Sequence, residues 1–217
     1  MFYWLARPVV ILLLKLLSRW EVSGRENLPG GGPLLVIFNH LGHLDPPLLM
    51  ATFPWRFTGL AVAGLRKVPL TGAFLQLSGV IWVNRSEYDR EALRKALHVL
   101  EKGGVLGIAP EGRISVTGAL ERAKNGPIFL AQRANVPILP VAITGTEKAL
   151  AELRRWRRPH LRVAIGRPFR LDASAGEVLS RREELRRQAD LLMLRLAELL
   201  PSEYRGVYAD RSLAELG

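Results

Sequence analysis

A histidine and an aspartate stand five positions apart, His40 and Asp45, shortly after the apolar run 34–38. On an α-helix, residues five apart differ by about 140° around the axis, so these two side chains could not meet on one helical face. They can meet only where the chain turns between them, and Gly42 permits such a turn because it has no Cβ. The Asp45 carboxylate can then accept a hydrogen bond from one ring nitrogen of His40, which leaves the other nitrogen as a general base.

The elements expected to position this pair are a buried strand and a short helix. Residues 34–38 read Leu-Leu-Val-Ile-Phe, a continuous apolar run typical of a strand buried on both faces. The run Asp45-Pro46-Pro47 is typical of a helix start, with Asp45 as the N-cap and Pro46 at the first helical position. An ordinary explanation stays open, because Asp45 is a good N-cap in its own right and His40 could be a structural histidine. Alone, the pair is a weak motif.

Three further blocks follow along the chain, each at or in a predicted strand. They are 79–85 (GVIWVNR), 109–115 (APEGRIS) and 136–143 (VPILPVAI). Ligands of open α/β sheets collect at strand ends. Taken in order with the first block, these segments resemble the glycerolipid acyltransferase family, best known for the 1-acylglycerol-3-phosphate (lysophosphatidic acid) acyltransferases, over about residues 20–170.

The resemblance implies a role for each matched position. His40 and Asp45 match the family's His-x4-Asp pair, in which the histidine deprotonates an acceptor hydroxyl that attacks an acyl thioester directly, without an acyl-enzyme. Asn39 is expected to support the loop and is grouped with the substrate-binding residues. The other positions assigned to acceptor binding are Arg85, Glu111, Gly112, Arg113, Ser115 and Lys124, the last with Gly126. Arg113 stands one position before the family's usual arginine, which leaves the acceptor headgroup more open than acyl transfer itself.

The chemistry of these side chains is consistent with an anionic acceptor. Arg85 and Arg113 follow separate predicted strands and could converge on one phosphate, because a guanidinium offers a planar fork of donors. Glu111 would then hold a guanidinium or a glycerol hydroxyl. The alternative is that all three are exposed charges or ion-pair partners. His43 is too near Asp45 to replace His40 but could line the same pocket.

Composition narrows the function classes. At 217 residues the chain is long enough for one α/β domain, and nothing marks a linker or repeat. Because the chain has no cysteine, disulfides, thiolate nucleophiles and cysteine-based metal sites are excluded. No metal and no cofactor are expected; the co-substrate is an acyl-CoA or acyl carrier protein thioester. The net charge of +11 calls for anionic partners. Three compete: an anionic membrane surface, acyl carrier protein or the phosphates of coenzyme A, and nucleic acid, which is the weakest because no binding module is visible.

The first twenty residues are strongly apolar, interrupted by Arg7, Pro8, Lys15 and Arg19. At about 100° per residue the three basic side chains fall within an arc of about 120°, which leaves a wide apolar face. The uninterrupted apolar run is too short to span a bilayer, so the pattern favours a monotopic helix lying in the membrane interface. The alternative is a helix packed on the core of the protein. A cytoplasmic-facing membrane location is implied by the resemblance, since that is where thioester donors are found.

Alternation of strand and helix patterns predicts an α/β fold with a mixed, mostly parallel sheet flanked by helices and an N-terminal amphipathic membrane helix. The predicted organisation is a membrane-anchoring helix at 1–20, an acyltransferase domain at 21–200 and a C-terminal tail at 201–217, for which a short packed helix is the alternative. Strands are expected at about 34–38, 58–63, 79–83, 104–109, 137–143 and 161–165. Helices are expected at about 2–19, 46–52, 70–77, 87–101, 122–133, 146–156 and 175–199.

The sequence therefore predicts a membrane-bound O-acyltransferase acting on a lysophospholipid, with 1-acylglycerol-3-phosphate as the leading acceptor and phosphatidic acid as the product. One rival is acyl transfer to another lysolipid. The other is a noncatalytic peripheral protein that binds anionic lipid through its N-terminus and basic surface, against which the intact His-x4-Asp pair argues.

Overall fold

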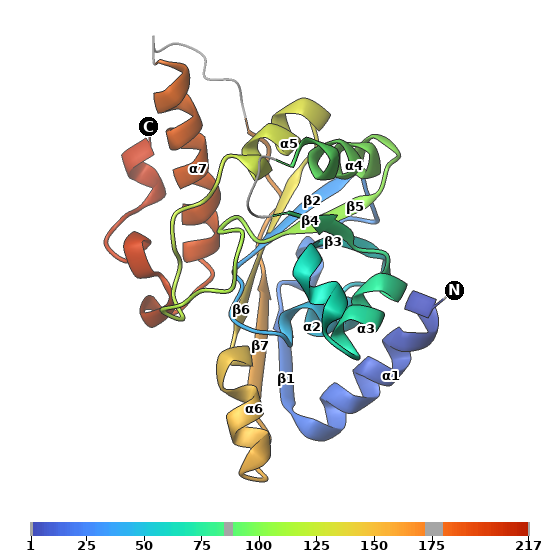
Figure 1. Cartoon of the computed structure of the whole chain (residues 1–217). Coiled ribbons are helices and arrows are strands. Elements are labelled where there is room, and N and C mark those ends of the chain that lie inside the picture. Colours follow the sequence, from blue (N-terminus) through green and yellow to red (C-terminus); the bar gives the residue numbers. More distant parts are fainter. Residues whose placement is uncertain (1, 85–88, 172–179, 217) are drawn as a thin grey trace.

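The computed structural model describes residues 2–84, 89–171 and 180–216. Within them, seven strands form one twisted sheet in the order β1-β7-β6-β2-β5-β3-β4 (Figure 1). The strands are β1 (Arg19–Ser23), β2 (Leu34–Phe38), β3 (Phe57–Val62), β4 (Ile81–Val83), β5 (Val105–Ile108), β6 (Ile138–Thr144) and β7 (His160–Ile165). Neighbours from β6 to β4 are parallel, β1 is parallel to β7, and β6 and β7 join the two groups antiparallel. The predicted mixed, mostly parallel sheet is confirmed.

Helices cover both faces of the sheet (Figure 1). One apolar cluster packs α1 (Phe2–Leu17) and α2 (Asp45–Thr52) on one face, with α3 (Thr71–Ser78) beside them. The other packs α4 (Arg90–Glu101), α5 (Gly126–Ala134) and α7 (Arg181–Ala197) on the opposite face. The sheet's central strand β2 is fully buried, as its five consecutive apolar residues predict. Helix α6 (Thr146–Arg154) projects beyond β6 at the lower end of the molecule in Figure 1.

All predicted helices and strands exist, with ends shifted by a few residues; the expected start of the last helix, 175–179, and part of the start of the helix at 87–101 lie outside the described residues. Strand β1 is the element that the sequence analysis missed. Its five residues alternate exposed and half-buried at the sheet edge, but only Trp20 and Val22 are apolar, so the alternation is too short to be a strong signal. What makes them a strand is pairing with β7, in register from Arg19 with His160 to Ser23 with Ala164.

Helix α1 packs on the protein and also presents an apolar face to solvent. Tyr3 and Leu14 are buried in the core. The sequence pattern grouped Arg7 with Lys15 and Arg19 in one polar arc, but its Nε donates to the Met50 and Phe53 carbonyls at 3.1 and 3.0 Å, at the C-terminal end of α2. The exposed large apolar side chains of α1 are Trp4, Leu5, Val9, Leu12, Leu13, Leu16 and Leu17. Among the described residues, no helix has both the length and the apolar character needed to cross a bilayer.

The segment treated above as a C-terminal tail packs against the domain. It forms short 3₁₀ helices at Ser202–Tyr204, Gly206–Tyr208 and Leu213–Leu216. Tyr208 is buried, and its hydroxyl donates to Asp190 of α7 at 3.1 Å. The Tyr204 carbonyl accepts from the Leu120 backbone N–H at 2.9 Å, which ties this segment to the loop before α5.

Candidate active site

The predicted hydrogen bond between His40 and Asp45 is present. His40 lies just beyond the carboxyl end of β2, the chain turns through Gly42, and α2 begins at Asp45. The Asp45 Oδ2 lies 2.6 Å from His40 Nδ1, with the Asp45 side chain fully buried and the His40 side chain 21% exposed. Because Nδ1 is engaged by a carboxylate, it carries the proton, and Nε2 is left with its lone pair available to a substrate hydroxyl.

Asp45 is held from several sides by the folded chain. Its Oδ2 also accepts the backbone N–H groups of Leu41 and Gly42, at 2.7 and 2.9 Å. The prediction that Asp45 is the N-cap of α2 is therefore wrong. Leu44 is the N-cap, and the Asp45 carboxylate instead accepts hydrogen bonds from the loop before the helix. These hydrogen bonds fix the position of the Asp45 carboxylate in the folded protein. A histidine that acts as a general base needs its orienting carboxylate to be held in this way.

Thr146 is a site residue that sequence reasoning missed. Its hydroxyl donates to Asp45 Oδ1 at 2.5 Å, in a buried contact between residues 101 positions apart. Thr146 opens α6 directly after strand β6, and a hydroxyl at the end of a parallel strand was the available signal. Both oxygens of Asp45 are thus occupied, so the carboxylate can rotate little about its own bond.

Asn39 joins the loop before His40 to strand β6. Its side-chain Nδ2 donates to the Ile143 carbonyl at 2.8 Å, and its Oδ1 accepts the Ile143 N–H at 2.7 Å. The side chain is buried with both ends of the amide engaged. The expected loop support is therefore present, and Asn39 is not among the residues that line the cavity at His40.

The loop from Pro110 to Lys124 closes over the same strand ends. The Ser115 N–H donates to the His40 carbonyl at 2.7 Å, and the Lys124 N–H donates to the Pro110 carbonyl at 2.9 Å. The Ser115 hydroxyl donates to the Ala119 carbonyl at 2.7 Å. Ser115 therefore positions the loop on the backbone of His40, and its hydroxyl stabilises the loop itself.

Glu111 is the buried acid of this loop, only 3% exposed. One carboxyl oxygen accepts the Glu121 N–H at 3.2 Å, and the other has no partner among the described residues. The expected guanidinium partner is absent from these contacts, because Arg113 pairs with Glu121 instead. Burial raises the pKa of Glu111 to about 7, since the charged carboxylate is poorly solvated there.

This raised pKa predicts a pH-dependent stability difference between the wild type and Glu111→Gln. The unfolded carboxyl ionises near 4.5 and the folded one near 7, so the folded state binds the extra proton in this window. The free energy of unfolding of Glu111→Gln relative to wild type should therefore rise by about 3 kcal/mol from pH 4.5 to 7 and stay level above pH 7. Urea unfolding followed by circular dichroism at several pH values measures it. A pH-independent difference would show that Glu111 stays ionised in the folded protein.

Arg113 forms an ion pair with Glu121. Its Nε and Nη2 both donate to Glu121 Oε2, at 3.0 and 2.5 Å, and Arg113 lines the cavity described below. An acceptor phosphate could use Arg113 only by sharing it with Glu121. Arg85, the second predicted arginine, lies outside the described residues.

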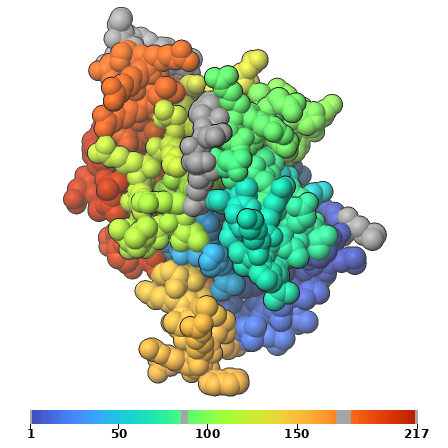
Figure 2. All heavy atoms as spheres, viewed as in Figure 1, coloured from blue at the N-terminus to red at the C-terminus, as the bar shows by residue number. Residues whose placement is uncertain are grey.

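A cavity of about 1150 Å³ opens at His40. In Figure 2 the light-blue segment around residue 40 is visible between the yellow-green loop before α5 and the teal segment that contains α3. On one side the cavity runs between α1, α2 and α3, along Tyr3, Met50 and Phe74; on the other it reaches Ala92 and Leu93 of α4. Its lining is mostly apolar, and His40 and Lys124 are among its polar members, which suits a lipid substrate with a reactive polar end.

The polar end of the cavity is basic. Gly112, Arg113, Lys124, Asn125 and Gly126 line it, and α5 begins at Gly126 without a side-chain cap. Uncapped N–H groups at a helix start favour anions. Among the described side chains, Lys124 makes no ion pair, and its side chain lies over Gly112, where an added Cβ would come within 3.1 Å of it. Exposed His43 also lines the cavity, as expected, but makes no hydrogen bond to Asp45.

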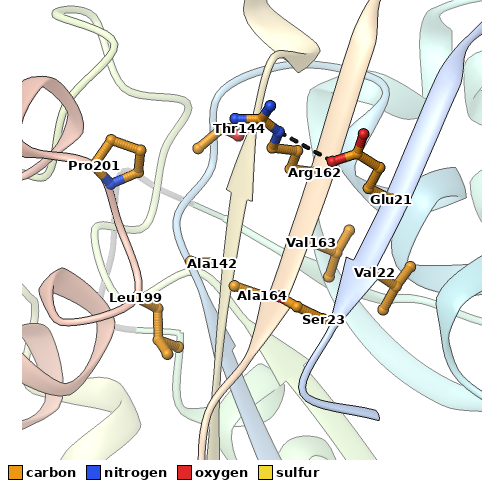
Figure 3. A pocket seen from close by; sticks show the side chains of 10 residues that line it. All are labelled: Glu21, Val22, Ser23, Ala142, Thr144, Arg162, Val163, Ala164, Leu199 and Pro201. Atoms are coloured by element: carbon orange, nitrogen blue, oxygen red, sulfur yellow. Dashed lines mark hydrogen bonds and ion pairs between the residues drawn. The ribbon is translucent and has the colours of Figure 1, made fainter.

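A second cavity of about 360 Å³ lies over strands β1, β7 and β6 (Figure 3). Its floor is made of small side chains, including Ser23, Ala142 and Ala164, and the Glu21–Arg162 ion pair borders it. It shares no lining residue with the cavity at His40. None of its described lining residues is a histidine, whereas the cavity at His40 contains the His40–Asp45 pair and is therefore the candidate active site.

Comparison with known proteins identifies relatives of this chain. A family model described as Acyltransferase matches residues 19–144, more than half of the chain. Two relatives named 1-acyl-sn-glycerol-3-phosphate acyltransferase, from Borreliella burgdorferi and Saccharomyces cerevisiae, are 34% identical over 127 residues and 33% identical over 150 residues. These matches cover 58% and 66% of this chain, and 51% and 49% of the relatives, so the chain matches about half the length of each.

A solved structure has a similar fold. The crystal structure of the 1-acyl-sn-glycerophosphate (LPA) acyltransferase PlsC from Thermotoga maritima matches with a TM-score of 0.65 and 26% sequence identity, over 85% of this chain and 75% of that one. The matched family segment, residues 19–144, contains β2, the His40–Asp45 pair and the loop that covers it. By its sequence match over more than half of its length, supported by its fold, the chain belongs to the Acyltransferase family.

Proposed function

We propose that this protein transfers a fatty acyl group from an acyl thioester to the free hydroxyl of a lysophospholipid, with 1-acylglycerol-3-phosphate as acceptor and phosphatidic acid as product. The observation that carries the proposal is the His40–Asp45 pair at the mouth of a large apolar cavity, with the histidine Nε2 left available. Relatives with the matching name support the choice of acceptor.

In the proposed reaction, His40 Nε2 takes the proton of the acceptor hydroxyl as its oxygen attacks the thioester carbonyl carbon. Asp45 Oδ2 stabilises the imidazolium that forms. The tetrahedral intermediate then expels the thiolate, which receives the proton from His40. No acyl-enzyme is needed, and the chain contains no cysteine that could form a thioester of its own. The donor is acyl-CoA or an acyl carrier protein thioester.

The proposed phosphate site is the basic end of the cavity, where Lys124 and the uncapped start of α5 face the space beside His40. Lys124→Ala should raise the KM for a phosphate-bearing acceptor roughly 10- to 100-fold, the worth of one charge-assisted hydrogen bond. The KM for the thioester should change little. Steady-state kinetics with lysophosphatidic acid and with uncharged monoacylglycerol measures the difference. Lys102→Ala, an exposed lysine outside the cavity, is the control, and an equal loss with both acceptors would contradict the phosphate role.

The apolar part of the cavity is proposed to hold the acyl chain. Gly59 of β3 lines it, and a Cβ added there would meet only the Phe57 ring, at 3.8 Å. Gly59→Val should therefore fold normally and fill part of the space, shifting the preference toward a thioester two carbons shorter by roughly tenfold. Competition between two acyl-CoA chain lengths measures the ratio. Thr58→Val is the control, because Thr58 lies on the same strand and does not line the cavity; an unchanged ratio in Gly59→Val would place the chain elsewhere.

We also propose that the protein works at a membrane surface, bound through the exposed apolar face of α1. The net charge of +11 favours the anionic cytoplasmic leaflet, where thioester donors are available. This membrane surface, the donor and the lysophospholipid are the proposed partners, and nucleic acid is not among them.

Thiol release from a long-chain acyl-CoA, with a panel of lysophospholipid acceptors, tests the proposal. Release that depends on lysophosphatidic acid supports it, and release with a different lysolipid would reassign the acceptor. If no acceptor releases thiol from acyl-CoA, the assay is repeated with an acyl carrier protein thioester. Failure with both donors, together with vesicle binding, would favour the noncatalytic lipid-binding protein.

A further inference from the structure

The turn that follows α6 carries a tryptophan with almost no contact to its own chain. Trp156 is 97% exposed. It also has a left-handed backbone conformation, with φ of 57°. The Trp156 N–H donates to the Leu153 carbonyl at 3.0 Å and the Arg157 N–H to the Glu152 carbonyl at 3.0 Å, the two bonds that close a helix in a Schellman motif. At the left-handed position of this motif glycine is strongly favoured, because a side chain there is strained.

The left-handed backbone at Trp156 is therefore unfavourable, and the exposed ring does not offset this strain by packing within the folded chain. A single exposed apolar side chain is common on protein surfaces and needs no explanation. Here the exposed ring coincides with an unfavourable backbone conformation and with a concentration of charge. A contact with a partner outside the chain would explain why a tryptophan stands at this position.

The residues around Trp156 are basic. Arg154, Arg155 and Arg157 are all exposed, and within the described chain none of them makes an ion pair or a side-chain hydrogen bond. We call Arg154, Arg155, Trp156 and Arg157 the arginine tip. Arginines beside an exposed indole match a phospholipid surface, because guanidinium groups bind phosphates and tryptophan is favoured at headgroup depth.

The arginine tip is attached to the end of α1. The next residue, Arg158, donates through Nη2 to the carbonyls of Lys15 and Ser18, at 2.6 Å each. Arg19 N–H then donates to the Pro159 carbonyl at 2.8 Å, which begins the pairing of β1 with β7. In Figure 1 the far end of α6 and the C-terminal end of α1 both lie at the lower end of the molecule. A surface that contacts the exposed leucines of α1 can therefore also reach the tip.

We propose that the arginine tip is a second membrane-docking surface, specific for anionic phospholipid, which fixes the orientation of the domain once the apolar face of α1 is bound. This inference rests on the proposed membrane function of α1 for the orientation, but it is tested by vesicle binding alone. With two contacts at different points, the domain can no longer rotate freely about the axis of α1. The tip supplies charge-dependent affinity, and α1 supplies apolar affinity.

Trp156→Gly is the first test. Glycine suits the left-handed position, so the melting temperature should stay the same or rise. Affinity for vesicles of phosphatidylcholine with phosphatidylglycerol should fall roughly tenfold, through the lost burial of the ring. Flotation of the full-length protein with vesicles measures the affinity. A lower melting temperature with unchanged vesicle affinity would overturn the proposal and make Trp156 a structural residue.

A matched pair of triple variants tests the charge. R154Q/R155Q/R157Q should lose roughly a hundredfold in affinity for the anionic vesicles at low ionic strength, and little for phosphatidylcholine alone. R181Q/R182Q/R186Q removes the same charge from three exposed arginines of α7, which begins at the opposite end of the molecule in Figure 1, and should lose far less. Equal losses in the two triple variants would mean that only net charge matters, and the tip would not be a docking surface.

Acyl transfer in detergent micelles separates this proposal from the proposed function. The tip variants should keep wild-type thiol release there, because the catalytic residues are untouched. If the wild type releases no thiol with any acceptor, the proposed function fails while the vesicle result still stands. If R154Q/R155Q/R157Q loses activity only with an acyl carrier protein donor, and binds vesicles like wild type, the tip is a site for an acidic protein and the membrane proposal is overturned.

Discussion

His40→Ala is expected to lower the rate of thiol release roughly 10²- to 10⁴-fold, the contribution usually supplied by a general base. The loss should appear in kcat, because the imidazole acts on the proton that moves in the transition state. The fold should survive: His40 is partly exposed, and Asp45 still accepts the N–H groups of Leu41 and Gly42 and the hydroxyl of Thr146. Steady-state kinetics together with the melting temperature checks both expectations.

His43→Ala is the matched control for this experiment. His43 lines the same cavity and lies three residues away, but it makes no hydrogen bond to Asp45. It should keep most of the wild-type rate. If His40→Ala retained most of its activity while remaining folded, His40 would not be the base.

Asp45→Asn is expected to lower kcat by roughly 10²-fold or more with the fold intact. The amide oxygen can still accept from His40, Leu41 and Gly42, and the amide N–H can donate to the Thr146 hydroxyl, which is able to reverse its role. What is lost is the negative charge that stabilises the imidazolium. Kinetics and circular dichroism of the purified variant measure the rate and the fold.

Asp45→Ala separates the charge from the hydrogen bonds. It leaves the buried Leu41 N–H and the Thr146 hydroxyl without partners, so the free energy of unfolding should fall by about 2–5 kcal/mol in addition to the loss of activity. Urea unfolding measures this. If Asp45→Asn were as unstable as Asp45→Ala, the role of Asp45 would be to close the loop rather than to supply charge to His40.

Several elements were predictable because their signals are local. The apolar run of β2, the alternation of apolar and charged residues in α4 and the two prolines at the start of α2 each depend on neighbours a few positions away. The contact between His40 and Asp45 belongs to the same class, since a turn of a few residues is enough to bring them together. The four blocks taken together carried the family resemblance, and the family match over residues 19–144, which contains all four, confirms the family.

The rest of the site required the folded chain. Strand β1 exists because it pairs with β7, 141 positions away at its first residue. Arg7 turns inward to the carbonyls at the end of α2, although the helical pattern alone grouped it with the other basic side chains of the first twenty residues. Arg113 forms an ion pair with Glu121, and both ends of the Asn39 amide hydrogen-bond to the backbone of Ile143. In each case the fold determines which partner lies within reach, and the periodicity of the sequence gives no information about it.

What the sequence by itself determined is the contact between His40 and Asp45 and the alternation of strands and helices that presents this pair at the ends of the strands. Only the tertiary structure decided how the pair is held, since Thr146 reaches Asp45 from 101 positions along the chain. It also decided that the strained, exposed Trp156 lies beside the end of α1. Local patterns reflect the backbone's own preferences, whereas the partners of buried polar groups depend on which strand ends the sheet brings together.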